Sequence, residues 1–97
     1  MYQIIDDINQ TKVAGFSASK LCNLNAKEIL HISLEEGFIF PTHTTPRDAT
    51  LLMLEGNVTF HINKKEYKLL RHQIFNFPKN TPHQVIAFED SKFLIIR

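Results

Sequence analysis

Apolar and polar residues alternate over several short stretches of the chain, which is the pattern of β-strands that bury one face. The clearest alternation covers residues 30–35 and 58–63, where Leu, Ile, Val or Phe occupies every second position. Shorter apolar runs cover residues 74–77, 85–88 and 93–96. Turn-forming residues separate these stretches at intervals of about 8 to 12 residues, a spacing typical of a β-sandwich or barrel. The pattern therefore predicts an all-β fold.

The segment that precedes the first clear strand follows a different pattern. Its isoleucines have the spacing of one helix face, so residues 1–16 can form either a short helix or an extended arm. Residues 17–97 contain no internal repeat and no linker, and a chain of 97 residues has the size of one domain. We predict a single domain over 1–97, in which 17–97 form the barrel.

The charge of the chain gives no indication of a nucleic-acid partner. Eleven Lys and Arg against ten Asp and Glu leave a formal net charge of +1, too little to attract phosphate over a whole surface. The basic residues between 64 and 71 alternate with apolar residues around a turn, which favours the solvated side of a hairpin. No helix-turn-helix or aromatic-basic motif accompanies them, so we expect no nucleic acid as partner.

Cys22 is the only cysteine, so no internal disulfide can form, as is usual in a reducing compartment. We interpret it as a small buried side chain rather than a reactive thiol. Asp6 and Asp7 stand where a secretory signal would carry positive charge, and no apolar run has the length of a membrane span. We expect a cytoplasmic protein that does not contact the membrane.

Two segments, separated by residues 57–71, carry glycine, histidine and proline at a fixed spacing. In the first segment the positions are Gly37, His43, Thr45, Ala49 and Gly56. In the second they are His72, Pro78, Asn80, His83 and Ala87. These two frames resemble the paired signatures of the cupin superfamily, G-x5-H-x-H-x3-E-x6-G and G-x5-P-x-G-x2-H-x3-N. The resemblance implies an RmlC-like double-stranded β-helix, the jelly-roll barrel of cupins.

Several backbone features fit these frames. Gly37 and Gly56 fall where strands must turn sharply, and Asn80 is the residue after Gly best suited to a left-handed backbone. Pro78 and Pro82 flank the loop that precedes the second-frame histidine, where they end the pairing of the strand. The chain thus keeps most of the turn chemistry of the cupin frames, and His72 in place of a glycine predicts a looser turn there.

Metal-binding cupins take two His and one Glu from the first signature and one His from the second. The resemblance places the corresponding ligands at His43, Thr45, Ala49 and His83, so only two imidazoles remain. Asp48 points away from the cavity by strand alternation, but a bulge at Pro46 would bring it in. The stretch 43–48 also resembles an H-x-T-P-x-D variant found in small cupins of unassigned function. A divalent Zn, Ni, Fe or Mn ion at His43 and His83 is one interpretation, and two hydrogen-bonded pocket histidines without metal are the other.

The remaining interior positions are apolar. Strand alternation from the two frames predicts a pocket lined by Thr45, Ala49, Leu51, Met53, Phe75 and Val85. Such a lining, with two imidazoles, matches a small-molecule site that is mostly apolar with a few polar groups. The alternative is that these side chains simply fill the core. His31 and His61 lie on the polar faces of their strands, where we predict surface or barrel-mouth positions.

Three functions from different classes fit the sequence. The first, which we favour, is a stand-alone cupin that binds a small molecule in its barrel without catalysis. The second is a metal-dependent enzyme of the isomerase or dioxygenase type, with a reduced ligand set at His43 and His83. The third is a purely structural or oligomerising module. We also expect a homodimer as a companion of the first function, because closed two-fold symmetry is the commonest oligomer.

Overall fold

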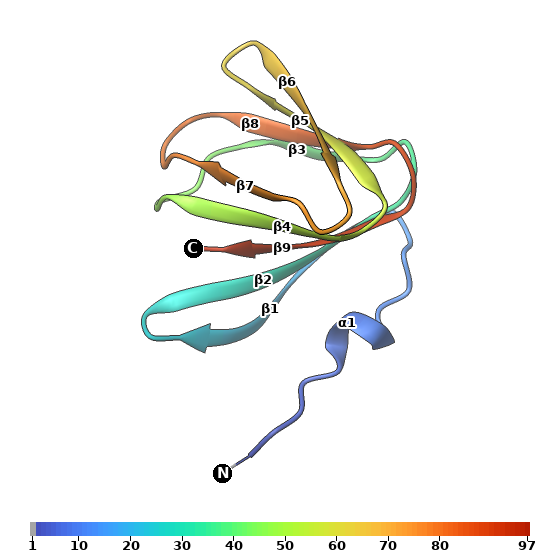
Figure 1. The fold of residues 1–97 in the computed structure, drawn as a ribbon, viewed down its shortest axis with the longest axis vertical. Helices are drawn as coiled ribbons and strands as arrows, with labels where there is room; N and C mark the ends of the chain where they lie inside the picture. Colours follow the sequence, from blue (N-terminus) through green and yellow to red (C-terminus); the bar gives the residue numbers. More distant parts are fainter. Residues whose placement is uncertain (1) are drawn as a thin grey trace.

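A computed structural model describes residues 2–97 and shows two antiparallel sheets that face each other across one core (Figure 1). In chain order the elements are α1 (Asp7–Gln10), β1 (Phe16–Leu24), β2 (Lys27–Leu34), β3 (Ile39–His43), β4 (Ala49–Glu55), β5 (Asn57–Ile62), β6 (Lys65–Leu70), β7 (Ile74–Phe77), β8 (His83–Ala87) and β9 (Ser91–Ile96). The only helix among the described residues is therefore one short turn.

The strands form a five-stranded sheet, in the order β1-β2-β9-β4-β7, and a four-stranded sheet, in the order β3-β8-β5-β6. From β2 to β9 the chain passes repeatedly from one sheet to the other, so most hydrogen-bonded neighbours are distant in sequence. This winding is the double-stranded β-helix, or jelly roll, and the predicted fold class is confirmed. No helix within residues 2–97 is long and apolar enough to cross a membrane.

The core lies between the two sheets and follows the alternation of the strands. Along β4, β5 and β8 every second side chain is buried, whereas the residues between them are partly exposed. The most deeply buried apolar side chains are Ile32, Leu34, Leu51, Met53, Val58, Phe60, Val85 and Phe93. Each full burial of such a side chain stabilises the fold by about 1.5–3 kcal/mol.

Left-handed backbone conformations occur at the tight turns that join the strands. Gly37 and Gly56 have φ angles of +81° and +79°, and Asn80 takes +58°, as its place in the second frame predicts. Gly56 is required for space as well, because a Cβ atom there would collide with the Asp90 carbonyl oxygen and the Ser91 hydroxyl. The short connection between β4 and β5 therefore tolerates only glycine.

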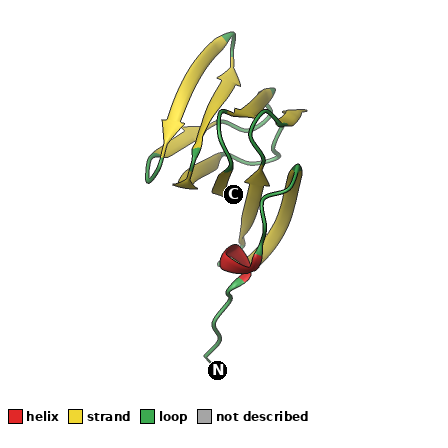
Figure 2. Ribbon diagram, turned by 90° about the vertical axis from the view of Figure 1, so that its right-hand side faces the viewer, coloured by secondary structure: helices red, strands yellow, loops and turns green. Residues whose placement is uncertain are grey.

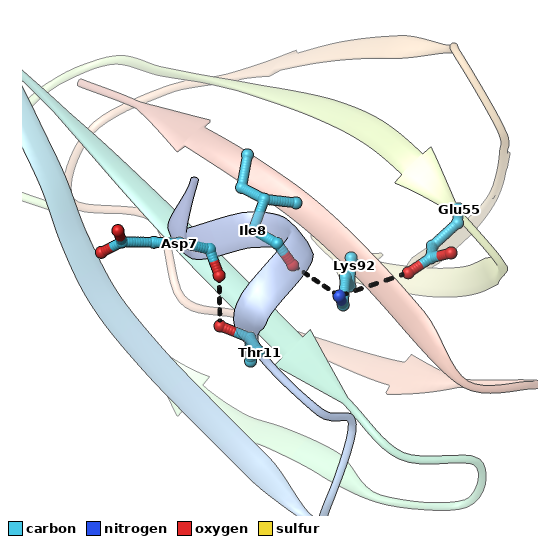
Figure 3. Close-up of polar contacts among 5 residues, drawn as sticks. All are labelled: Asp7, Ile8, Thr11, Glu55 and Lys92. Carbon is cyan, nitrogen blue, oxygen red and sulfur yellow. Dashed lines mark hydrogen bonds and ion pairs between the residues drawn. The ribbon is translucent and has the colours of Figure 1, made fainter. Parts of the chain in front are cut away.

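The N-terminal segment packs α1 against the outer face of the five-stranded sheet. Lys92 of β9 donates from Nζ to the carbonyl oxygen of Ile8 at 2.6 Å and lies 3.8 Å from Glu55 Oε1 (Figure 3). The residues before α1 extend away from the barrel (Figure 2), and the side chain of Tyr2 is fully exposed. His31 lies on the covered face and is only 1% exposed, so the prediction of a surface position for it is wrong.

Candidate ligand pocket and histidine pair

The pairing of β3 with β8 brings the two motif histidines together inside the barrel. His43 ends β3, His83 begins β8, and the register places one opposite the other. A register shift between Phe40 and His43 accommodates Pro41, which cannot donate to the ladder. The Nε2 atoms of the two imidazoles lie 3.0 Å apart.

The outer nitrogens of both rings face backbone carbonyl groups. His43 Nδ1 lies 2.6 Å from the Pro41 oxygen, and His83 Nδ1 lies 2.9 Å from the Thr81 oxygen. A carbonyl oxygen can only accept a hydrogen bond, so both Nδ1 atoms carry the ring protons. In the neutral rings, the two Nε2 lone pairs then face each other. A hydrogen bond between the two Nε2 atoms therefore requires one proton shared by the two rings.

Aromatic rings surround the pair and restrict its contact with water. His83 is 3% exposed and packs beside the rings of Phe60 and Phe77, with centroid distances of 5.2 and 4.7 Å. His43 stacks on Phe40 at 4.1 Å. Burial lowers the pKa of His83, although the hydrogen bond to the Thr81 carbonyl opposes this effect. A proton is therefore held less readily here than on an exposed histidine.

The other ligand positions of a metal-binding cupin supply no donors. Thr45 Oγ1 donates to the Arg47 carbonyl oxygen at 2.7 Å, and Ala49 has no donor atom. Asp48 is exposed and accepts a hydrogen bond from the Lys79 backbone N–H at 2.9 Å, so its carboxylate does not join the pair. Within residues 2–97 no three His, Cys, Asp or Glu side chains converge. Two imidazoles do not fit the three or four protein ligands of a complete zinc site.

A cavity of about 220 Å³ lies beside His43, between the two sheets. Strands β1, β2 and β3 contribute two lining residues each and β7 and β9 one each, beside two residues outside the strands: Phe16, Ala18, Leu30, Ile32, Phe40, His43, Thr45, Phe77, Ile95 and Arg97. Most of these side chains are apolar, and Phe16 contacts Phe40 with a ring-centroid distance of 4.5 Å. The cavity thus has apolar walls and a few polar groups, as small-molecule sites do.

The structure divides the six predicted lining residues between this cavity and the core. Thr45 lines the cavity. The side chains of Ala49, Leu51, Met53 and Val85 belong to the buried hydrophobic cluster, and that of Phe75 packs against it.

Sequence reasoning missed the walls from β1, β2 and β9, because the two cupin frames cover neither end of the chain. The alternation of Leu30 and Ile32 with polar neighbours was the signal that could have identified them.

Comparisons with known proteins agree with this fold. A family model described as a cupin domain matches residues 30–96. No curated protein matches the chain.

Among solved structures, a conserved protein of unknown function from Streptococcus pyogenes superposes with a TM-score of 0.83 at 21% identity, covering 99% of this chain and 86% of that one. A protein with a cupin-2 domain from Shewanella frigidimarina has a TM-score of 0.80 at 19% identity, covering 95% and 88%. The DMSP lyase DddQ from Ruegeria pomeroyi has a TM-score of 0.75 at 16% identity, covering 84% of this chain and 46% of that one. At these identities the likeness shows the fold alone.

Proposed function

The chain belongs to the cupin family, and we propose that it binds a small molecule with an apolar body in the cavity beside His43, without catalysis. The cavity is the observation that supports this proposal most directly. About 220 Å³ stays open beside His43, with the exposed residues Phe16 and Ala18 in its lining, while Leu51, Met53 and Val85 fill the neighbouring core.

The size and walls of the cavity indicate the kind of ligand. Its volume is below the roughly 300–1,000 Å³ of sites for drug-sized molecules, so the ligand is small. Phe16, Phe40 and Phe77 supply aromatic surface, which favours a flat apolar body that stacks on a ring. Removal of apolar surface from water, at about 25 cal/mol per Å², provides most of the binding free energy.

A cavity-filling variant tests this function directly. Ala18 lies on the edge strand β1 and lines the cavity, so Ala18→Leu places a larger side chain in the ligand's volume without disturbing the central strands. Ser19 is the next residue on the same strand and points to the opposite face, which makes Ser19→Leu the matched control.

The experiment is a thermal-shift screen with small aromatic and aliphatic compounds, followed by titration of those that raise the melting temperature. We expect Ala18→Leu to abolish the shifts and Ser19→Leu to keep them. Compounds that stabilise both variants equally, or a wild-type protein that no compound stabilises, would contradict the proposed function.

A metal-dependent enzyme of the isomerase or dioxygenase type is the second candidate, and two observations favour it. Both Nδ1–H groups donate to backbone carbonyls, as second-shell contacts of metal-bound histidines do. The Nε2 separation of 3.0 Å also falls within the roughly 2.9–3.4 Å that separates neighbouring ligands about 2.0–2.1 Å from one zinc ion. Other groups would have to complete the coordination sphere.

Metal content decides between the two candidates. Tag-free protein is analysed for Zn, Ni, Fe and Mn beside the variants His43→Ala and His83→Ala. Near-stoichiometric metal that both folded variants lose would support the metal site. Metal-free wild-type protein, even after incubation with each ion, would exclude it and leave the cavity as the functional feature.

We also propose a homodimer. β1 is an edge strand that pairs only with β2 among the described residues, and most of its nine side chains are exposed. Exposed edges of this length are usually covered in natural proteins. A second copy could pair along β1, and light scattering during size-exclusion chromatography tests this: a dimer mass supports the proposal, and a monomer at all concentrations contradicts it.

A further inference from the structure

The cavity has three polar side chains in its lining, and two of them already use their hydrogen-bonding groups within the protein. Thr45 donates its hydroxyl proton to the Arg47 carbonyl oxygen. His43 has Nδ1 at the Pro41 carbonyl and Nε2 at His83. Polar recognition of a ligand must therefore come mainly from the third side chain, Arg97.

The backbone of Arg97 is fixed by hydrogen bonds, but its guanidinium has few hydrogen-bond partners. Its backbone N–H donates to the Glu28 carbonyl at 3.0 Å and its carbonyl accepts from the Glu28 N–H at 2.6 Å, which fixes its position beside β2. In contrast, Arg97 Nε is buried without a hydrogen-bond partner among the described residues. Nη2 lies 4.0 Å from Glu28 Oε2, at the outer limit of an ion pair. Nη2 thus retains N–H donors for an incoming acceptor, because 4.0 Å is longer than a hydrogen bond.

The electrostatic surroundings of Arg97 favour an anion with a single charge. Arg47 donates from Nη1 to the Ala26 carbonyl oxygen in the turn just before β2, so a second guanidinium lies near the same hairpin. Glu28 offsets part of this positive charge, and its side chain is exposed enough to turn toward water. A carboxylate carries one charge and matches the planar fork of arginine, whereas a phosphate monoester would bring about −1.5 to −2 charges.

On the basis of the proposed function, we propose that the ligand is a small aromatic monocarboxylate whose carboxylate binds Arg97 and whose ring lies against the phenylalanine walls. Phe16, Phe40 and Phe77 supply the apolar surface. Arg97 is then a specificity residue that distinguishes an acid from a neutral molecule of the same shape.

The test uses phenylacetate and phenylacetamide, which share a shape and differ in charge, titrated into the full chain by calorimetry or NMR. We expect the acid to bind the wild-type protein at least tenfold more tightly than the amide. Arg97→Gln should remove this preference, because the acid loses its guanidinium partner. Arg71→Gln, at an exposed arginine outside the cavity lining, is the matched control and should keep the preference.

Glu28→Gln provides an independent variant in case Arg97→Gln does not fold. It removes the competing carboxylate and should tighten acid binding several-fold without affecting the amide. Equal binding of acid and amide to the wild-type protein, or an equal loss of preference in Arg71→Gln, would overturn the role of Arg97 and leave the cavity as a ligand site. Failure of both compounds to bind would overturn this ligand class, and the broader screen with Ala18→Leu would then decide the proposed function.

Discussion

The barrel interior and its outer face each bury one histidine, His83 and His31, and the two differ in their hydrogen-bond partners. His83 in the interior is 3% exposed, and both of its ring nitrogens have partners, Thr81 and His43. His31 on the outer face is 1% exposed, and its Nε2 has no hydrogen-bond partner among the described residues. Burial alone therefore does not indicate a functional histidine. The interior histidine pairs with His43, whereas the outer one leaves a ring nitrogen without a partner among the described residues.

The largest expected effect comes from removing the interior histidine. His83→Ala leaves a cavity beside Phe60 and Phe77 and takes away the partner of His43, so we expect a loss of about 2–4 kcal/mol in the free energy of unfolding. His43→Ala should cost less because that side chain is partly exposed. Urea denaturation measures both values. An equal or larger loss in His43→Ala would contradict the account.

The outer histidine should behave in the opposite way. His31→Leu removes a buried polar atom without a partner and keeps the volume nearly constant, so we expect the free energy of unfolding at pH 8 to rise by about 1 kcal/mol. Urea denaturation provides the measurement. At this pH His31 of the wild-type protein is neutral in both the folded and the unfolded state. A destabilisation above about 1 kcal/mol would show that His31 has a partner in solution.

Lowering the pH should destabilise the protein through His31, unlike a histidine on the surface. Burial, followed by the charge of Lys92, lowers the pKa of His31, while Asp7 and Glu55 act against this shift. Below about pH 6.5, His31 binds a proton more readily in the unfolded chain than in the folded protein. The free energy of unfolding therefore falls as the pH drops toward 5. His83 contributes with the same sign, because its pKa is also lowered.

Denaturation curves between pH 8 and pH 5 test this dependence. His31→Leu should reduce the slope of the free energy of unfolding against pH. The reduction is at most about 1.4 kcal/mol per pH unit, the limit for one proton. Ser33→Ala, on the same covered face, is a control without a titratable group and should keep the wild-type slope. A His31→Leu slope equal to that of the wild type would contradict the assignment.

The smallest effect is expected at the contact that holds the N-terminal segment. Glu55→Gln weakens the 3.8 Å pair with Lys92, and because Glu55 is largely exposed the loss should stay below about 0.5 kcal/mol. Lys92→Met also removes the 2.6 Å hydrogen bond to Ile8, so hydrogen exchange in α1 should accelerate. Unchanged exchange in Lys92→Met would show that other contacts hold α1 on the sheet.

The sequence was sufficient for the fold and for the meeting of the two motif histidines. Period-two alternation identified the strands, and the spacing of the cupin frames assigned His43 and His83 to strands that pair in the structure. The cavity could not be predicted from the sequence, because alternation shows which side chains point inward but not which of them pack closely together. Leu51 and Met53 fill their space, while Ile95 borders an opening.

Two further features depend on contacts between distant segments. Arg97 reaches the cavity only because β9 pairs with β2, some 60 residues earlier in the chain. His31 is buried because the segment around Ile8 crosses the sheet and is held by Lys92. No local pattern in the sequence predicts either contact.

Methyl NMR during a titration with phenylacetate tests the central claim most directly, because it locates the ligand inside the barrel. We predict intermolecular nuclear Overhauser effects from the aromatic ring to the methyl groups of Leu30, Ile32 and Ile95, which line the cavity. Leu51 and Met53, packed in the filled core, should show none. Contacts to the core methyl groups alone, or no contact with any of these five residues at saturating ligand, would contradict a ligand site in this cavity.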